Sequence, residues 1–158
     1  MTINYFAPVR MTLALLPRML ERGTGTIVNV ASVAGRVGTP REAAYSGSKF
    51  ALSGFTEVLA VDLWDTPIEV RLVQPGPIDT PIWGLPDNEA ASYSGPKFPP
   101  EDVAAACVAA LRGDATFETF VPADFKGIAE FKAANIDTFM QGAASFDASG
   151  GEIPDIPR

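Results

Sequence analysis

The chain has 158 residues, with 19 acidic and 12 basic residues, a formal net charge of −7 and no histidine. An apolar fraction of 47% is typical of a globular domain that buries about two-thirds of its unfolded surface. One cysteine, Cys107, and no histidine exclude an intrachain disulfide, a His/Cys zinc site and a histidine-based triad, so we expect no metal site. The acidic balance argues against nucleic acid, and no apolar run reaches the ~18 residues of a membrane span.

Charge is distributed unevenly along the chain. Residues 1–78 sum to +1 and residues 79–158 to −8, so we expect the hydrophobic core in the first half. The apolar run from Met11 to Leu16 is too short for a signal peptide and lies between two arginines. We therefore expect an ordinary helix there, in a cytoplasmic protein.

Residues 3–21 are predicted to form the first helix, which Arg22 to Gly25 end. Pro17 should weaken or kink its last part. Residues 26–30 (TIVNV) form a β-branched run without alternation, which is typical of a strand covered on both faces. The apolar stripe of the helix consists of Phe6, Val9, Leu13, Leu16 and Leu20.

A second helix is expected over about 42–64, where Phe55, Leu59 and Leu63 form a ridge. A second strand follows over 68–74. Helices alternating with strands predict an α/β fold with a parallel sheet and right-handed crossovers.

The remaining sequence predicts shorter elements. Residues 76–100 hold six of the fourteen prolines and are expected to form a long loop. A helix is expected over 101–111 and a short strand over 117–121. We expect one amphipathic helix over 123–140 and a flexible, acidic tail over 141–158.

Tyr45 and Lys49 lie four residues apart in the second predicted helix, so their side chains share one face about a turn apart. A phenol has a pKa near 10, and a neighbouring ammonium lowers that pKa by favouring the phenolate. The spacing predicts an acid–base pair, although a surface tyrosine and a surface lysine would give the same pattern. Tyr93 and Lys97 repeat the spacing, but Gly95 and Pro96 between them cannot sustain a helix, so we interpret that pair as coincidence.

Other polar residues follow the predicted strands. Ser32 comes just after the first strand, at the edge where open α/β sheets bind ligands, although serine there is also a common turn former. The run from Pro75 to Thr80 (PGPIDT) leaves the second strand at the same edge, either as a binding loop or as a simple strand terminator. Asn4 fits either a helix cap or a polar site.

Together these segments resemble the short-chain dehydrogenase/reductase family over about residues 2–122. The resemblance is carried by Asn4, by TIVNVASVAG at 26–35, by YSGSK at 45–49 and by PGPIDT at 75–80. Their order and spacing make the match far more specific than any one motif. The resemblance implies a doubly wound parallel sheet and interconversion of an alcohol and a ketone with NAD or NADP.

The resemblance also implies a role for each site residue. Tyr45 would be the general acid/base, Lys49 would lower its pKa and hold the nicotinamide ribose, Ser32 would orient the substrate oxygen, and Asn4 would anchor a water. The expected cofactor-binding residues are Tyr45, Lys49, Pro75, Gly76, Ile78 and Thr80.

The sequence departs from the family pattern in one large respect. The family's opening strand with its glycine-rich turn, and its Asn-Asn-Ala-Gly segment, do not occur. We therefore expect a partial doubly wound sheet, an incomplete Rossmann-like fold, over 1–122, and an N-terminally truncated chain that is inactive alone. The strand at 26–30 would then have a bare edge, which favours pairing. We expect a homo-oligomer through helices 3–21 and 42–64. The alternative is a non-catalytic interaction module or inactive remnant that pairs through the bare edge.

Overall fold

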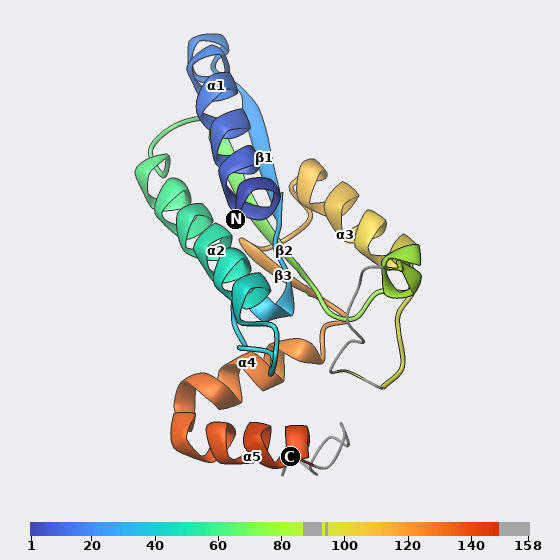
Figure 1. Ribbon diagram of the computed structural model, residues 1–158. Coiled ribbons are helices and arrows are strands. Elements are labelled where there is room, and N and C mark those ends of the chain that lie inside the picture. The colour runs from blue at the N-terminus through green and yellow to red at the C-terminus, as the bar shows by residue number, and fades with distance from the viewer. Residues whose placement is uncertain (87–92, 94, 149–158) are drawn as a thin grey trace.

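A three-stranded parallel sheet organises the described part of the chain, which comprises residues 1–86, 93 and 95–148 of a computed structural model (Figure 1). The strands are β1 (Gly25–Val30), β2 (Ile68–Pro75) and β3 (Glu118–Val121), in the order β1-β2-β3. Parallel pairing places Val30 beside Val73, and Pro75 beside Val121. The expected α/β fold with a parallel sheet is confirmed.

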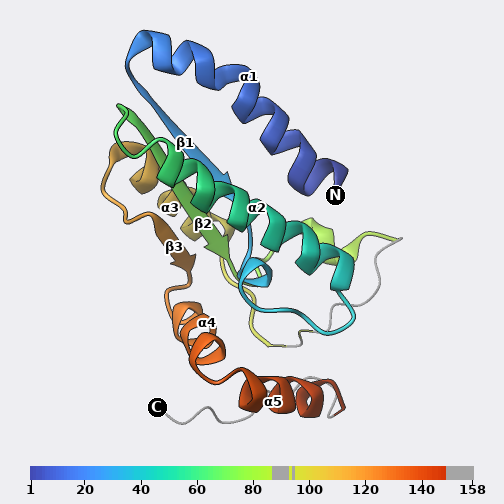
Figure 2. The same cartoon turned by 90° about the vertical axis from the view of Figure 1, so that its left-hand side faces the viewer.

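Helices cover both faces of this sheet (Figures 1 and 2). Helices α1 (Ala7–Arg22) and α2 (Ala43–Asp62) lie on one face, and α3 (Pro100–Arg112) packs on the other against all three strands. In the described residues β1 has a neighbour on one side only, because its pairing is with β2. The sheet is therefore a partial doubly wound sheet with an open β1 edge.

Helix α1 lies at the margin of the core. A π-helical turn, Thr2–Phe6, leads into it, and Gly23 ends it with a φ of 73°. The helix continues past Pro17 to Arg22, so Pro17 does not end it. Thr12 is buried, whereas much of the apolar surface of α1 is exposed, at Met11, Leu13, Leu15 and Leu20.

The core lies between α2 and β2. Leu59 of α2 and Leu63, which caps that helix, are buried against Ile68 and Val70, and Phe55 packs beside them, as the predicted ridge requires. A second cluster joins Ala31, Leu52 and Leu72. Strand β2 is the central strand and is the most deeply buried of the three. Its packing on both sides holds its carboxyl end in place.

The C-terminal region differs from the sequence-based expectation. Instead of one helix over 123–140 there are two, α4 (Phe125–Ala134) and α5 (Ile136–Ala148), separated by Asn135 with φ −139° and ψ 57°. Helix α5 extends to Ala148, so residues 141–148 are helical, and the rest of the predicted tail lies outside the described residues. Both helices lie beyond the carboxyl ends of the strands (Figure 2).

The long loop after β2 is partly ordered by local structure. A 3₁₀ turn occupies Pro81–Gly84, and Ile78 forms a bridge with Phe98. The loop at 82–98, which includes Trp83 and Leu85, lies partly outside the described residues at 87–92 and 94. Across the described ranges, no helix combines the length and apolarity needed to cross a bilayer.

Candidate active site

The predicted site residues gather where β1 and β2 end. Ser32 follows β1 and caps the 3₁₀ turn Val33–Gly35, because its hydroxyl oxygen accepts a hydrogen bond from the Ala34 N–H at 3.1 Å. The same hydroxyl donates to the Pro75 carbonyl at 3.2 Å. Ser32 is therefore fixed to the end of β2, at the edge where open α/β sheets bind ligands.

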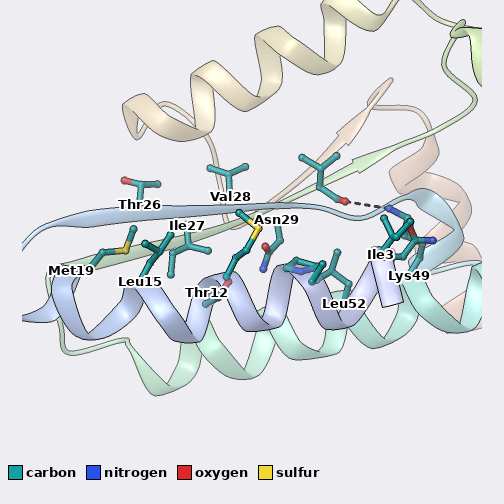
Figure 3. Close-up of a pocket in the computed structure, with 15 residues that line it drawn as sticks. Ile3, Thr12, Leu15, Met19, Thr26, Ile27, Val28, Asn29, Lys49 and Leu52 are labelled. Atoms are coloured by element: carbon teal, nitrogen blue, oxygen red, sulfur yellow. Dashed lines mark hydrogen bonds between the residues drawn. The ribbon is translucent and has the colours of Figure 1, made fainter. Parts of the chain in front are cut away.

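Tyr45 and Lys49 lie on α2, which passes beside this edge. The Lys49 ammonium is 5.7 Å from the centre of the Tyr45 ring, as expected for residues one helical turn apart. The same ammonium donates a hydrogen bond to the Val30 carbonyl at 3.3 Å (Figure 3). Tyr45 exposes 40% of its surface, so its phenol is accessible to a ligand.

The electrostatics of Tyr45 differ from the expectation. Its pKa is raised above the ordinary value of 10.0, chiefly because partial burial disfavours the phenolate. A hydrogen bond with the Ser32 side chain lowers the pKa, and the Glu42 carboxylate raises it. Burial also lowers the pKa of Lys49.

Asn4 reaches α2 through a buried serine. Its amide donates to the Ser48 hydroxyl at 3.1 Å, and that hydroxyl donates to the Tyr45 carbonyl at 2.7 Å. The π-helical turn containing Asn4 is thereby attached to the helix that carries Tyr45 and Lys49. Asn4 thus lies within the site and is not a helix cap.

The segment after β2 contributes the other predicted residues. The Gly76 N–H donates to the Val121 carbonyl at 2.8 Å, and a Cβ at Gly76 would lie 2.8 Å from the Phe125 ring. The close approach at Gly76 is therefore to α4. The Ile78 carbonyl accepts a hydrogen bond from the Trp83 indole at 2.5 Å, and the Thr80 side chain makes no cap bond to the following 3₁₀ turn.

A groove of about 470 Å³ opens between α1 and β1 (Figure 3). Side chains on both faces of β1, such as Val28 and Ile27, line it, which places the groove at the open edge of the strand. Asn4 and Lys49 also line it, whereas Ser32 and Tyr45 do not. The groove therefore brings two of the four predicted catalytic residues together, whereas Ser32 and Tyr45 lie outside its lining.

The second Tyr–Lys pair has a different environment. The Tyr93 hydroxyl donates to the Pro96 carbonyl at 3.1 Å, and Lys97 lies 4.8 Å from the Trp83 ring. Residues 95–97 are not helical, as Gly95 and Pro96 predict.

Two residues of the site were missed by sequence reasoning. Gln74 is fully buried at the end of β2, and Gly35 lies so close to α2 that a Cβ would be 2.8 Å from the Lys49 carbonyl. For Gln74 a signal was available in the sequence, because a glutamine stands within an apolar strand. A buried amide requires hydrogen-bond partners, so this position points to a polar network.

Comparison with known proteins is consistent with this geometry. The family model described as short chain dehydrogenase matches residues 1–89, which is more than half of the chain. The chain belongs to the short-chain dehydrogenase family. Its relatives in this family are oxidoreductases, and the motifs at Ser32, Tyr45 and Lys49 fall within the matched residues.

Curated members of the short-chain dehydrogenase family match about half of the chain. The dehydrogenase/reductase SDR family member 7B of Rattus norvegicus is 45% identical over 80 residues, covering 51% of this chain and 25% of the rat protein. The 3-ketodihydrosphingosine reductase of Bacteroides thetaiotaomicron is 41% identical over 92 residues, covering 58% of this chain and 33% of that protein. The matched regions are therefore about a quarter to a third of these relatives.

Solved structures extend the match through the C-terminal region. A short-chain dehydrogenase from Burkholderia cenocepacia in complex with NADP superimposes with a TM-score of 0.71 at 32% identity, covering 86% of this chain and 55% of that one. A short-chain dehydrogenase from Sphingobium yanoikuyae in complex with NADPH gives a TM-score of 0.68 at 26% identity, covering 99% of this chain and 56% of that one. The chain spans about half the length of these dehydrogenases.

Proposed function

We propose that this chain carries the acid–base site of an oxidoreductase that interconverts an alcohol and a ketone with NAD or NADP. The observation that carries the proposal is the position of Tyr45, which lies one helical turn from Lys49 on α2, the helix that packs against the Ser32 turn. In the reductive direction the Tyr45 phenol donates a proton to the carbonyl oxygen. In the oxidative direction the phenolate removes a proton from the hydroxyl.

The neighbouring residues orient the reactants around that phenol. The Ser32 hydroxyl, held at the rim of the sheet, hydrogen-bonds with the substrate oxygen. The Lys49 ammonium exchanges its bond to Val30 for the ribose hydroxyls of the cofactor. Asn4 anchors a water that connects the lysine to solvent.

The residues after β2 fit the nicotinamide end of such a cofactor. Lys49 supplies an ammonium donor, and the Thr80 side chain makes no cap bond and can donate to an amide or a phosphate. Pro75, Gly76 and Ile78 form the backbone edge along which the ring would lie. When bound, the cofactor supplies or accepts the hydride at the carbonyl carbon.

The chain spans about half the length of the solved short-chain dehydrogenases that it matches. The match covers 55% of the Burkholderia dehydrogenase, so the remainder of that protein has no counterpart in this chain. We propose that turnover requires such a part, and that the chain alone oxidises NADPH or NADH only weakly.

A chimera tests the proposed function. The part of the Burkholderia dehydrogenase that this chain does not cover is joined to the chain, and oxidation of NADH and NADPH is measured with a panel of ketones. We expect activity in the chimera, and Tyr45→Phe should reduce kcat by about 10²–10⁴. Tyr93→Phe is the matched control and should retain activity, because the Tyr93 hydroxyl donates to Pro96 within its own loop. Activity that survives Tyr45→Phe would refute the role of Tyr45.

A second candidate function is an interaction module that pairs through the open edge of β1. The groove along this edge favours it, because unpaired strand edges recruit other strands. The Ala31 N–H donates to Val73, so Val28, three residues earlier, directs its N–H to the open edge. Val28→Pro should then abolish oligomers seen by light scattering without removing a β1–β2 bond.

The two candidates differ in their response to cofactor and to Lys49. The oxidoreductase predicts a rise in melting temperature of the chimera with NAD(P)H that Lys49→Ala reduces. The interaction module predicts oligomers of the chain alone, no cofactor effect and indifference to Lys49→Ala.

We also propose a homo-oligomer formed through α1 and α2. The outer face of α2 exposes Val58 and Val61, Trp64 is exposed just beyond the end of the helix, and α1 exposes Leu13 and Leu20. Exposed apolar side chains of this kind favour an interaction site on this surface.

A further inference from the structure

Gln74 is a fully buried amide in the central strand. Its side chain is 0% exposed, between Val73 and the Pro75 that ends β2. An amide transferred from water to an apolar interior costs free energy unless its hydrogen bonds are replaced. Gln74 should therefore have partners that maintain it there.

Each polar atom of this amide has such a partner. The Gln74 Oε1 accepts a hydrogen bond from the backbone N–H of Ser32 at 3.1 Å. Its Nε2 donates to the Ser53 hydroxyl at 3.2 Å and to the Glu118 carboxylate at 2.8 Å. One side chain thus joins the turn after β1, helix α2 and strand β3.

The contacts around this amide fix the Ser32 turn against α2. At Gly35, in the same turn, an added Cβ would lie 2.5 Å from the Ser53 hydroxyl. Arg36, one residue further, donates to the Glu118 carboxylate at 2.7 Å. The turn is therefore attached at both ends to the groups that Gln74 contacts.

We propose that Gln74 is a positioning residue, which holds the Ser32 turn against α2, the helix that carries Tyr45. Gln74 has no contact with the reacting atoms in this arrangement and acts through Ser32. The inference rests on the proposed function, in which Ser32 and Tyr45 act on one substrate oxygen.

The consequence can be measured at Tyr45 without cofactor or substrate. The hydrogen bond with Ser32 lowers the pKa of Tyr45, so loss of Ser32 alignment should raise the midpoint of phenol ionisation. This midpoint is followed by ultraviolet absorbance of the full chain, as the difference from the same chain carrying Tyr45→Phe.

Four variants separate positioning from general stability. Gln74→Met retains volume but removes the acceptor for Ser32, and should raise the midpoint in the same direction as Ser32→Ala. Gln74→Glu combined with Glu118→Gln retains both the acceptor and the bond to β3, and should restore the wild-type midpoint. Asn29→Leu is the matched control: the Asn29 amide is also buried and also bonds α2, donating to the Thr56 hydroxyl 2.9 Å away rather than bonding the Ser32 turn. It should lower stability and leave the midpoint unchanged.

The possible outcomes distinguish this inference from the proposed function. A wild-type midpoint in Gln74→Met, alongside a raised midpoint in Ser32→Ala, would refute positioning by Gln74 and leave the role of Ser32 intact. An unchanged midpoint in Ser32→Ala would refute the contact on which both depend. If Gln74→Met does not fold, the shorter Gln74→Asn, which cannot reach Ser32, replaces it with the same expectation.

Activity provides an independent measurement. In the chimera, Gln74→Met should lower kcat more than it raises KM, since misplacement of Ser32 affects the reacting oxygen rather than cofactor contacts. The swapped pair should recover kcat, and an inactive chimera would refute the proposed function without changing the titration result.

Discussion

The Lys49 ammonium lies 3.3 Å from the Val30 carbonyl at the open edge of β1. Because the Ala31 N–H points to β2, the Val30 carbonyl points away from it, to the side where a further strand would pair. A strand paired there would donate an N–H to this carbonyl and release the lysine. The availability of Lys49 is thus connected to the completeness of the sheet.

Lys49→Met should leave the chain as stable as the wild type at pH 7, or more stable. Burial lowers the pKa of Lys49 below 10.5 in the folded state, so its charge opposes folding at neutral pH. That cost disappears as the pH rises through the folded-state pKa, so wild-type stability should increase with pH relative to the variant. Urea unfolding at pH 7 and at higher pH measures this difference.

Lys126→Met is the control for that experiment. Lys126 lies in an exposed ion pair with Glu130 at 3.5 Å, and such pairs contribute about 0–1 kcal/mol. A loss of stability in Lys49→Met well above that in Lys126→Met would show that the bond to Val30 is structural.

The rate of ketone reduction by the chimera should be independent of pH around neutrality and fall in alkali. Burial raises the pKa of Tyr45 above 10.0, so the phenol carries its proton throughout the neutral range. Alcohol oxidation, which needs the phenolate, should increase with pH over the same interval. A reduction profile that falls well below pH 10 would mean that the added part of the protein lowers this pKa.

The same raised pKa affects stability, with a sign that follows from linkage. The folded state binds the phenolic proton of Tyr45 more tightly than the unfolded state. This binding therefore stabilises the fold below the pKa of the unfolded chain, and the stabilisation is lost as the pH rises through the pKa of the folded chain. Tyr45→Phe should therefore lose less stability between pH 9 and 11 (about one unit on each side of the reference value) than the wild type. Thermal unfolding across this range measures the difference.

Much of the fold was predictable because its elements have strong local signals. The β-branched run at 26–30 identifies a strand, which is half-buried with Val30 exposed, and the ridge of Leu59 and Leu63 identifies the helix that packs on the sheet. The break at Asn135 carried no comparable signal, since the helix periodicity continues on both sides of it. Its position follows from backbone angles that local propensity does not determine.

The sequence predicted which residues form the candidate site better than it predicted their pKa values. Tyr45, Lys49 and Ser32 could be identified from spacing and motif. The direction of the Tyr45 pKa could not, because it depends on burial of the phenol and on where the Lys49 ammonium bonds. Gln74 was missed because its three partners are 21 to 44 residues away in sequence.

Gly35→Ala should destabilise the chain by about 1–3 kcal/mol, the usual cost of overpacking. The added Cβ would lie 2.5 Å from the Ser53 hydroxyl and 2.8 Å from the Lys49 backbone carbonyl. A helical backbone atom cannot move aside without shifting α2. Urea unfolding measures the change.

Gly47→Ala is the matched glycine substitution. Gly47 lies within α2 with nothing within 4 Å of an added Cβ, so alanine should stabilise the helix by about 0.5–1 kcal/mol. Equal effects of the two substitutions would contradict the close contact of the Ser32 turn with α2.

The outer face of α2 should determine oligomeric state. Val61 is 72% exposed and Trp64 is 82% exposed, and burial of such side chains between two copies would stabilise each by about 1.5–3 kcal/mol. Val61→Glu places a charge in that surface and should shift the chain to a single 16.7 kDa species in light scattering coupled to gel filtration. Val108→Glu, on an exposed position of α3, is the control and should retain the oligomer. If Val61→Glu leaves the mass unchanged while Val28→Pro reduces it, the copies associate through the edge of β1 and not through the helices.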